Sequence, residues 1–202
     1  MTTITVASFN IEWMNKWFYN DNTKATFRPT FKKNGHVSST DETAGRAAAV
    51  IREIDPDILA VQEAPSRQKE MELFIREYLS EDGTPLYKCF HSKKGGQQHL
   101  SLLYKPDVFD PITHVPSSKL PLLSTPFLCD ITGDGILEDY TFTRIPLVAD
   151  LNLGDQTLRI ITVHIKSKRV NEGKKRWKNE EKRPEFIRDA LECRRRISAE
   201  AM

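Results

Sequence analysis

Two ionisable side chains of this sequence stand where apolar segments end, a position from which a side chain can reach a ligand. Glu63 lies near the end of segment 57–64, whose two faces are apolar almost to the last residue, as in a buried central strand. Burying a carboxylate is costly unless it is paired or bound to a metal ion. Open α/β sheets bind ligands at the carboxyl ends of their strands. Glu63 is therefore either a ligand-binding group at such an edge or a carboxylate that simply reaches solvent.

His164 follows a row of alternate apolar residues on one face of segment 157–165, and so emerges at the end of its strand as Glu63 does. A histidine in this position is either a satisfied core residue or a group that contacts a ligand. Segment 3–13 ends in a similar way, because Asn10 and Glu12 lie on one face at its end.

The elements expected to position these side chains alternate along the chain. Apolar residues at helical spacing predict a helix that ends near Ile54 and a second from Ser66 to about Gly83. A succession of strand, helix, strand and helix indicates the α/β class. The other expected elements are strands at 86–90, 99–104, 140–151 and 157–165 and a helix that begins near Pro184.

The segment 14–40 is polar, contains interleaved aromatic residues and shows no clear periodicity. So long a segment without periodicity is usually functional or disordered. It is either a loop that contacts a ligand or a surface loop with scattered aromatic residues.

Composition limits the class of protein. A chain of 202 residues with 39% hydrophobic residues is long enough for one domain with a sizeable core. Its three cysteines, Cys89, Cys129 and Cys193, are odd in number and far apart, which disfavours a disulfide framework or a structural zinc site. No apolar run is long enough to span a membrane and no signal-peptide core follows Met1, so we expect a cytoplasmic protein.

The net charge of +2 names no partner, but the charge is unevenly distributed. Between residues 166 and 183, nine Lys and Arg residues stand against three Glu residues, and Trp177 lies among them. Such a run can follow a nucleic-acid backbone while the aromatic ring stacks on a base. It can also be an ordinary solvated face.

Four short motifs follow one another along the chain. They are Ser-Phe-Asn-Ile-Glu-Trp at 8–13, Asp-Ile-Leu-Ala-Val-Gln-Glu at 57–63, Thr-Arg-Ile-Pro-Leu at 143–147 and Val-His-Ile-Lys-Ser at 163–167. In this order and at this spacing they resemble the endonuclease/exonuclease/phosphatase, or deoxyribonuclease-I-like, superfamily. The resemblance implies an α/β fold with a four-layer α/β/β/α sandwich, truncated at the C-terminus, in which residues 1–202 form one incomplete domain.

The resemblance also implies roles for five residues of these motifs. Glu63 matches the divalent-metal ligand of the family. Asn10 matches the Asn that helps to position the metal and the scissile phosphate, so it is a candidate for both metal binding and catalysis. His164 resembles the catalytic His that contacts the phosphate or the leaving group. Arg144 and Lys166 are expected to bind the phosphate of the substrate.

The cofactor that the resemblance implies is Mg²⁺, with Mn²⁺ as an alternative. Mg²⁺ prefers one or two carboxylates together with waters and substrate phosphate, so one Glu with a neighbouring Asn is adequate. Glu12, two residues after Asn10, is a candidate secondary ligand. A metal ion and cationic side chains would stabilise the charge that builds on phosphorus when water attacks.

Two later motifs of the family, Gly-Asp-x-Asn and Ser-Asp-His, do not occur in this chain. They supply a general base and a second His, and acid and base groups contribute on the order of 10²–10⁴-fold each. We therefore expect the chain alone to be nearly inactive. It is interpreted as a fragment of a longer enzyme; the alternatives are a chain completed by another C-terminal segment or polypeptide, and a degenerate member kept for binding.

The expected function is that of a metal-dependent phosphoester hydrolase. A nuclease that acts on nucleic-acid phosphodiesters is favoured, because the basic run 166–183 adjoins the presumed site. A phosphatase or phospholipase-type member is the alternative within the superfamily. A binding or scaffold protein that keeps the fold without the chemistry is the alternative of another class.

Overall fold

The fold was analysed in a computed structural model, which describes residues 3–21, 23–33, 35–92, 98–109, 112–116, 119–165, 170 and 172–201. The chain divides into two compact units. The first comprises Met1–Val115 and Pro146–Val163, and the second comprises Pro116–Ile145 and His164–Met202.

A four-stranded sheet forms the centre of the first unit. Its strands lie in the order β1 (Val6–Asn10), β4 (Ile58–Ala64), β8 (His99–Tyr104) and β7 (Lys88–His91). Strands β1 and β4 are parallel, and their register brings Asn10 opposite Gln62. The polar carboxyl ends of these two strands therefore lie side by side, at the edge where open α/β sheets bind ligands.

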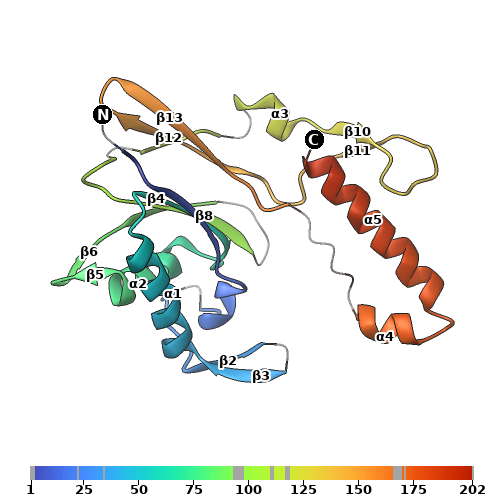
Figure 1. The fold of residues 1–202 in the computed structure, drawn as a ribbon, viewed down its shortest axis with the longest axis horizontal. Coiled ribbons are helices and arrows are strands. Elements are labelled where there is room, and N and C mark those ends of the chain that lie inside the picture. Colours follow the sequence, from blue (N-terminus) through green and yellow to red (C-terminus); the bar gives the residue numbers. More distant parts are fainter. Residues whose placement is uncertain are drawn as a thin grey trace. The chain divides into compact units, whose positions relative to one another are not determined.

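Two helices cover one face of this sheet (Figure 1). Helix α1 (Thr40–Ile54) begins after Ser39, whose hydroxyl accepts a hydrogen bond from the Glu42 amide at 3.3 Å and so satisfies one amide of the first turn. Helix α2 (Gln68–Tyr78) is shorter than predicted. The helices bury their facing side chains against the sheet in one apolar cluster. Its members from the two helices include Ala44, Ala47, Ala48, Ile51, Met71, Leu73, Phe74 and Ile75.

The segment after α2 explains why that helix ends early. A two-residue hairpin of β5 (Ser80–Glu81) and β6 (Thr84–Pro85) follows it. Gly83 turns this hairpin with a φ of 77°, in the left-handed region that glycine adopts without steric cost. The sequence prediction extended the helix to this glycine, although the chain has already turned back there.

A second sheet packs on the opposite face of the central sheet (Figure 1). It contains β13 (Gln156–Thr162), β12 (Leu147–Leu153) and β9 (Ile112–His114), in that order. The apolar cluster between the two sheets includes Ile58, Leu100, Leu102, Phe109, Leu147, Ala149 and Leu151. Fully burying a leucine, isoleucine or phenylalanine side chain contributes roughly 1.5–3 kcal/mol. This cluster is therefore a major source of stability.

The first unit thus has three layers, one of helices and two of sheets. The predicted α/β class is confirmed. The fourth layer of the predicted sandwich would cover the outer face of the second sheet, where Asp150 and Arg159 are cross-strand neighbours joined by an ion pair of 2.7 Å. This part of the face is polar rather than apolar, and the four-layer sandwich stays a prediction.

The segment 14–40, which showed no periodicity, is folded onto the helices. It contains the 3-10 helix η1 (Met14–Trp17) and the hairpin of β2 (Thr30–Lys33) and β3 (His36–Ser39). Trp17, Phe18 and Phe31 are buried in the cluster that α1 and α2 share. Several of the interleaved aromatic residues are therefore core residues at irregular spacing.

The second unit contains short elements and two helices at its C-terminal end. They are α3 (Pro121–Ser124), β10 (Phe127–Cys129), β11 (Glu138–Tyr140), α4 (Gly173–Lys178) and α5 (Arg183–Ala201). The predicted strand 140–151 is instead divided between β11 and β12, and Pro146 lies between them. Proline lacks the N–H that a strand interior needs, which accounts for the interruption.

The three cysteines are free, as predicted. Within the ranges that the structure describes, no helix combines the length and the apolar character that crossing a membrane requires.

Candidate functional site

Glu63 occupies a β-bulge at the end of β4. The pairing of β4 with β8 shifts between Gln62 and Ala64, and Glu63 itself has a φ of 56°. A bulge redirects a side chain and interrupts the regular pairing. A non-glycine residue in the left-handed region costs on the order of 1–3 kcal/mol and persists only where its surroundings hold it there.

The end of β1 supplies the groups that hold Glu63. The backbone N–H of Trp13 donates to Glu63 Oε2 at 2.9 Å, and Asn10 Nδ2 donates to Glu63 Oε1 at 3.3 Å. Asn10 is fixed in turn, because its Oδ1 accepts a hydrogen bond of 2.9 Å from the amide of Glu12. Both carboxylate oxygens are therefore oriented by donors from the neighbouring strand end.

The chain turns sharply after Asn10, which the sequence did not predict. The expected strand 3–13 ends at Asn10, and Glu12 and Trp13 have φ values of 51° and 61°. This turn aims the Trp13 N–H at Glu63. Three non-glycine residues with left-handed backbones thus occupy two adjacent strand ends, and such strain is concentrated at functional sites.

Glu12 does not lie beside Asn10 on a continued strand, so that part of the prediction is wrong. Its carboxylate forms an ion pair with Lys33 of β2. A pocket of about 260 Å³ is lined by Asn10, Glu12, Lys33 and Arg46 among others. The pocket thus places the Lys33–Glu12 ion pair and the cationic Arg46 side chain next to Asn10.

The residues around Glu63 fit a hard divalent cation. Among the described residues, no three His, Cys, Asp or Glu side chains come together as a metal cage. Mg²⁺ does not require such a cage, since it retains waters and binds through one or two carboxylates and substrate phosphates. Donors that orient a ligating carboxylate, as Asn10 and Trp13 orient Glu63, are the usual outer shell of a metal site.

Arg144 and His164, predicted from separate motifs, are brought together in the second unit. Arg144 Nη1 donates to the backbone carbonyls of His164 at 3.4 Å and Ile165 at 3.3 Å. Strand β13 ends at Thr162, so the prediction that His164 lies within this strand is wrong. His164 belongs to the segment that follows the strand. Lys166 lies outside the residues that the structure describes.

Glu200, near the end of α5, was missed by the sequence analysis. It is 7% exposed and its Oε1 accepts hydrogen bonds of 2.8 Å from both the Tyr140 hydroxyl and the Thr143 amide. Burial and the Glu200 carboxylate raise the pKa of Tyr140. Glu200 therefore fixes the residue that precedes Arg144, and nothing in its sequence context distinguishes it from an ordinary helical Glu.

Two buried histidines lie beside the end of β4. His99 is paired with Ala64 across the sheet, and its ring stacks on that of His91, with centroids 5.0 Å apart. His91 Nδ1 shares a hydrogen bond of 2.6 Å with the Ser101 hydroxyl. Burial, with a smaller contribution from His99, lowers the pKa of His91 to about 4, so the His91 imidazole is neutral at pH 7.

The structure thus brings together two pairs of predicted site residues. Asn10 contacts Glu63 in the first unit, and Arg144 contacts the backbone of His164 in the second.

Known structures resemble this one to a limited degree. A crystal structure of humanized D. rerio TDP2 with 14 mutations has a TM-score of 0.41 and 12% identity, and the match covers 87% of this chain and 52% of that one. For truncated Caenorhabditis elegans TDP2 the TM-score is 0.37 and the identity 19%, with 71% of this chain and 48% of that chain covered. A further crystal structure of TDP2 from C. elegans has a TM-score of 0.37 and 19% identity, with 73% and 37% covered.

The chain spans about half the length of the first of these structures. No family model and no curated protein sequence matches it. With TM-scores below 0.5, these likenesses leave the functional assignment to the residues of the site.

Proposed function

We propose that this chain carries the metal-binding and phosphate-binding part of a Mg²⁺-dependent phosphoester hydrolase that cleaves nucleic-acid phosphodiesters. The observation that carries the proposal is the arrangement of Glu63 at the adjoining ends of two parallel strands. Its backbone is in the left-handed region, and its carboxylate accepts two hydrogen bonds. A solvent-directed Glu needs neither the bulge nor the two donors.

Each residue of the site has a distinct part in this proposal. Glu63 holds the cation, and Asn10 keeps the carboxylate in place. A Mg²⁺ ion held there, or Mn²⁺ in its place, would supply positive charge that stabilises the phosphate during hydrolysis. Arg144 contributes positive charge toward the phosphate oxygens, together with Lys166. His164 holds or transfers a proton at the leaving-group oxygen.

A nucleic-acid substrate is favoured over a small phosphate ester by the surface around α4. Its lysines are exposed, Trp177 is 51% exposed, and the Arg183 guanidinium lies 5.5 Å from the Trp177 ring. Cationic side chains interleaved with an open aromatic ring suit a phosphodiester backbone with bases. The proposal treats residues 1–202 as part of one catalytic domain, with the general base supplied by a complementing segment or chain.

The direct test is hydrolysis by the complete gene product on single-stranded DNA, duplex DNA, RNA, inositol phosphates and sphingomyelin. We expect Mg²⁺-dependent cleavage of a nucleic acid that Glu63→Gln lowers by on the order of 10²–10³-fold. Glu72→Gln, on the exposed side of α2, is the matched control and should leave the rate unchanged. Hydrolysis that needs no divalent metal, or that survives Glu63→Gln, would contradict the proposal.

The same panel separates the alternatives. Cleavage confined to inositol phosphates or sphingomyelin would replace the nuclease by a phosphatase or phospholipase. No cleavage of any substrate would favour a binding or scaffold protein.

A further inference from the structure

One feature not used by the proposed metal site is a pocket of about 670 Å³ in the first unit. Its wall is formed by the segment around η1, by the β2–β3 hairpin and by the residues that lead into α2. Small-molecule sites in proteins commonly have volumes of about 300–1,000 Å³. The pocket is therefore large enough for a single nucleotide.

The charge of the wall favours an anion. Lys16, Arg28 and Lys32 line the pocket, and the acidic side chain that lines it is Glu70. The Glu70 carboxylate is 3% exposed, accepts a hydrogen bond of 3.0 Å from the Arg67 amide and forms an ion pair with the Arg67 side chain. Its charge is thus compensated within the wall, and three cations remain to face a ligand.

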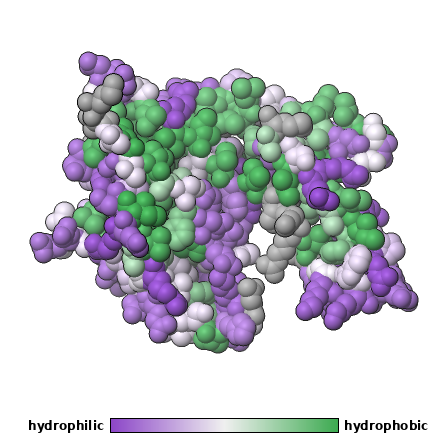
Figure 2. Space-filling model, viewed as in Figure 1, coloured by the Kyte–Doolittle hydropathy of each residue, from purple (hydrophilic) through white to green (hydrophobic). Residues whose placement is uncertain are grey.

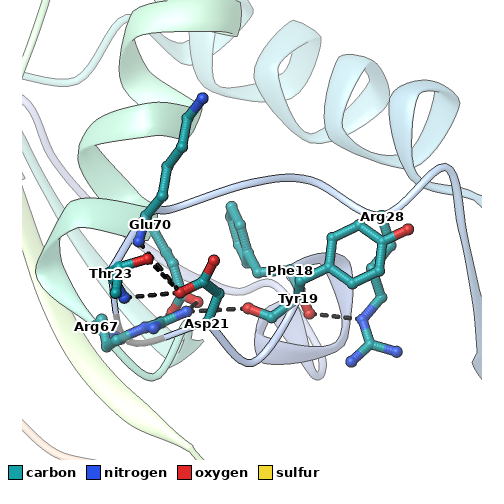
Figure 3. A network of polar contacts seen from close by, with 8 residues as sticks. Phe18, Tyr19, Asp21, Thr23, Arg28, Arg67 and Glu70 are labelled. Atoms are coloured by element: carbon teal, nitrogen blue, oxygen red, sulfur yellow. Dashed lines mark hydrogen bonds and ion pairs between the residues drawn. The ribbon is translucent and has the colours of Figure 1, made fainter.

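Arg28 is the cation best placed to hold a phosphate. Its Nε donates to the Phe18 carbonyl at 2.6 Å, which fixes the direction of the guanidinium (Figure 3). The two terminal nitrogens make no hydrogen bond with any residue that the structure describes. A guanidinium fixed at Nε and open at both terminal nitrogens can bind phosphate through two parallel hydrogen bonds.

Tyr19 offers a flat apolar surface beside this cation. Tyr19 is 46% exposed as a residue, and the Arg28 guanidinium lies 5.3 Å from the centre of its ring. The Tyr19 backbone is held on both sides. Its N–H donates to the Thr26 carbonyl at 3.0 Å, and its carbonyl accepts from Arg67 Nη2 at 3.0 Å (Figure 3). An exposed ring on a fixed backbone is a suitable stacking surface for a base.

Aromatic packing anchors the wall of the pocket. Phe18 stacks on Phe27 with ring centroids 4.7 Å apart, and the two residues also form a backbone bridge. Trp17 and Phe31 anchor the same segment in the core of the first unit. A preformed wall lowers the entropy cost of binding.

Two residues that line the pocket lie close in sequence to the Glu63 site. Trp13, whose N–H donates to Glu63, is two residues before Asn15, which lines the pocket. Ser66, three residues after Glu63, also lines it. A strand bound with one phosphate at Glu63 can therefore continue into this pocket.

We infer that the pocket binds one nucleotide of a single-stranded segment of the substrate, with its phosphate on Arg28, Lys16 and Lys32 and its base on Tyr19. The inference rests on the proposed function for the identity of the ligand, but binding at this pocket requires no metal. The site is a positioning site for the strand and performs no chemistry.

The test measures binding of a fluorescein-labelled twelve-residue oligothymidylate to the full chain by anisotropy in EDTA. We expect Tyr19→Leu to weaken binding by about 5- to 100-fold, whereas Tyr19→Phe, which keeps the ring, binds as the unchanged chain does. Arg28→Lys keeps the charge but loses the two terminal nitrogens that can bind phosphate in parallel. It should weaken binding by about 10-fold.

The lysines give a second readout. The double variant Lys16→Gln and Lys32→Gln should lower the slope of log affinity against log salt by about 1.4, or about 0.7 for each lost phosphate contact with a single strand. Lys24→Gln is the matched control, since Lys24 is exposed in the same segment but does not line the pocket. Its slope and affinity should not change.

A crosslinking measurement on the unchanged chain tests the inference without any variant that could misfold. An oligonucleotide that contains 5-iododeoxyuridine should crosslink under ultraviolet light to Tyr19, as mapped by mass spectrometry. Crosslinks at Trp177 without any at Tyr19 would overturn the inference, as would equal affinities of the Leu and Phe variants at position 19. Competition by thymidine monophosphate distinguishes a site for free nucleotides, which it would block fully at millimolar concentration, from a site that needs the strand.

Failure of this inference and failure of the proposed function are distinguishable. If binding depends on Tyr19 and Arg28 while the complete gene product hydrolyses nothing, the proposed function is wrong and the nucleotide-binding pocket is supported. If Tyr19→Leu changes neither the rate nor the KM of metal-dependent cleavage, the inference about the pocket is wrong and the proposed function is supported.

Discussion

The two units of this chain are stabilised in different ways. The first buries two apolar clusters, one between helices and sheet and one between two sheets. Among the described residues of the second, Ile131 and Ala199 are the buried apolar side chains, while Leu122, Leu128, Ile136 and Leu137 are 91%, 63%, 64% and 60% exposed. Apolar side chains on the surface of this unit are visible in Figure 2.

Polar contacts hold the second unit instead. Glu200 binds Tyr140 and Thr143, Arg195 Nη1 donates to the Thr132 carbonyl at 2.8 Å, and Arg176 forms an ion pair of 2.9 Å with Asp189. Hydrogen bonds to charged groups contribute about 1.5–3 kcal/mol each, whereas exposed ion pairs contribute about 0–1 kcal/mol. Glu63 and Asn10 therefore belong to a unit with two apolar clusters, whereas Arg144 and His164 belong to a unit with few buried apolar side chains, the kind of region that opens locally at a low free-energy cost.

The strongest test of this contrast is a deletion in the core of the first unit. Phe74 is fully buried and its ring packs against Trp17 and Tyr78. We expect Phe74→Ala to lower the free energy of unfolding by about 3–5 kcal/mol, as measured by urea denaturation. Leu122→Ala in the second unit is the control and should change it by less than about 0.5 kcal/mol. Comparable losses in both variants would show that the second unit has a core of its own.

The buried His91 makes the stability of the first unit depend on pH. Its pKa is about 4 in the folded chain against an ordinary value of 6.5, so the unfolded chain binds the additional proton between these values. Stability from this group is fully present above about pH 6.5 and is lost as the pH falls toward 4, by on the order of 3 kcal/mol. Urea denaturation of the unchanged chain and of His91→Gln across pH 4–7 measures it. An equal acid loss in both proteins would assign it to other groups.

The Glu200 contacts give the smallest of these effects. Glu200→Ala leaves the Thr143 amide and the Tyr140 hydroxyl without their acceptor, at a cost of about 1–3 kcal/mol. We expect this cost to appear as faster hydrogen exchange of the second unit, with the first unit unchanged. The pKa of Tyr140 should also fall, because the Glu200 carboxylate helps to raise it; an ultraviolet titration measures this shift. Loss of protection throughout the chain would contradict the independence of the two units.

The sequence predicted the elements whose patterns are periodic. The alternation in 57–64 and the helical spacing of Met71 and Phe74 identified β4 and α2, and with them the place of Glu63 at a strand end. These patterns are visible because burial imposes a fixed period on each element.

The parts that the sequence did not predict depend on contacts that have no period. The bulge at Glu63 and the turn at Glu12 and Trp13 arise where two strand ends meet, and a backbone N–H from Trp13 carries no side-chain signature. The segment 14–40 buries several of its aromatic residues at irregular intervals. Glu200 acts on a segment distant in sequence, which no local pattern encodes.

Mn²⁺ binding by the chain tests most directly whether Glu63 is a metal ligand held by the end of β1. Electron paramagnetic resonance measures it without any need for turnover. We predict that Glu63→Gln abolishes specific binding, that Asn10→Ala weakens it by about 10- to 100-fold, and that Glu72→Gln leaves it unchanged. If the Glu63 and Glu72 variants bind Mn²⁺ as tightly as the unchanged chain does, Glu63 is not a metal ligand and the proposed site is wrong.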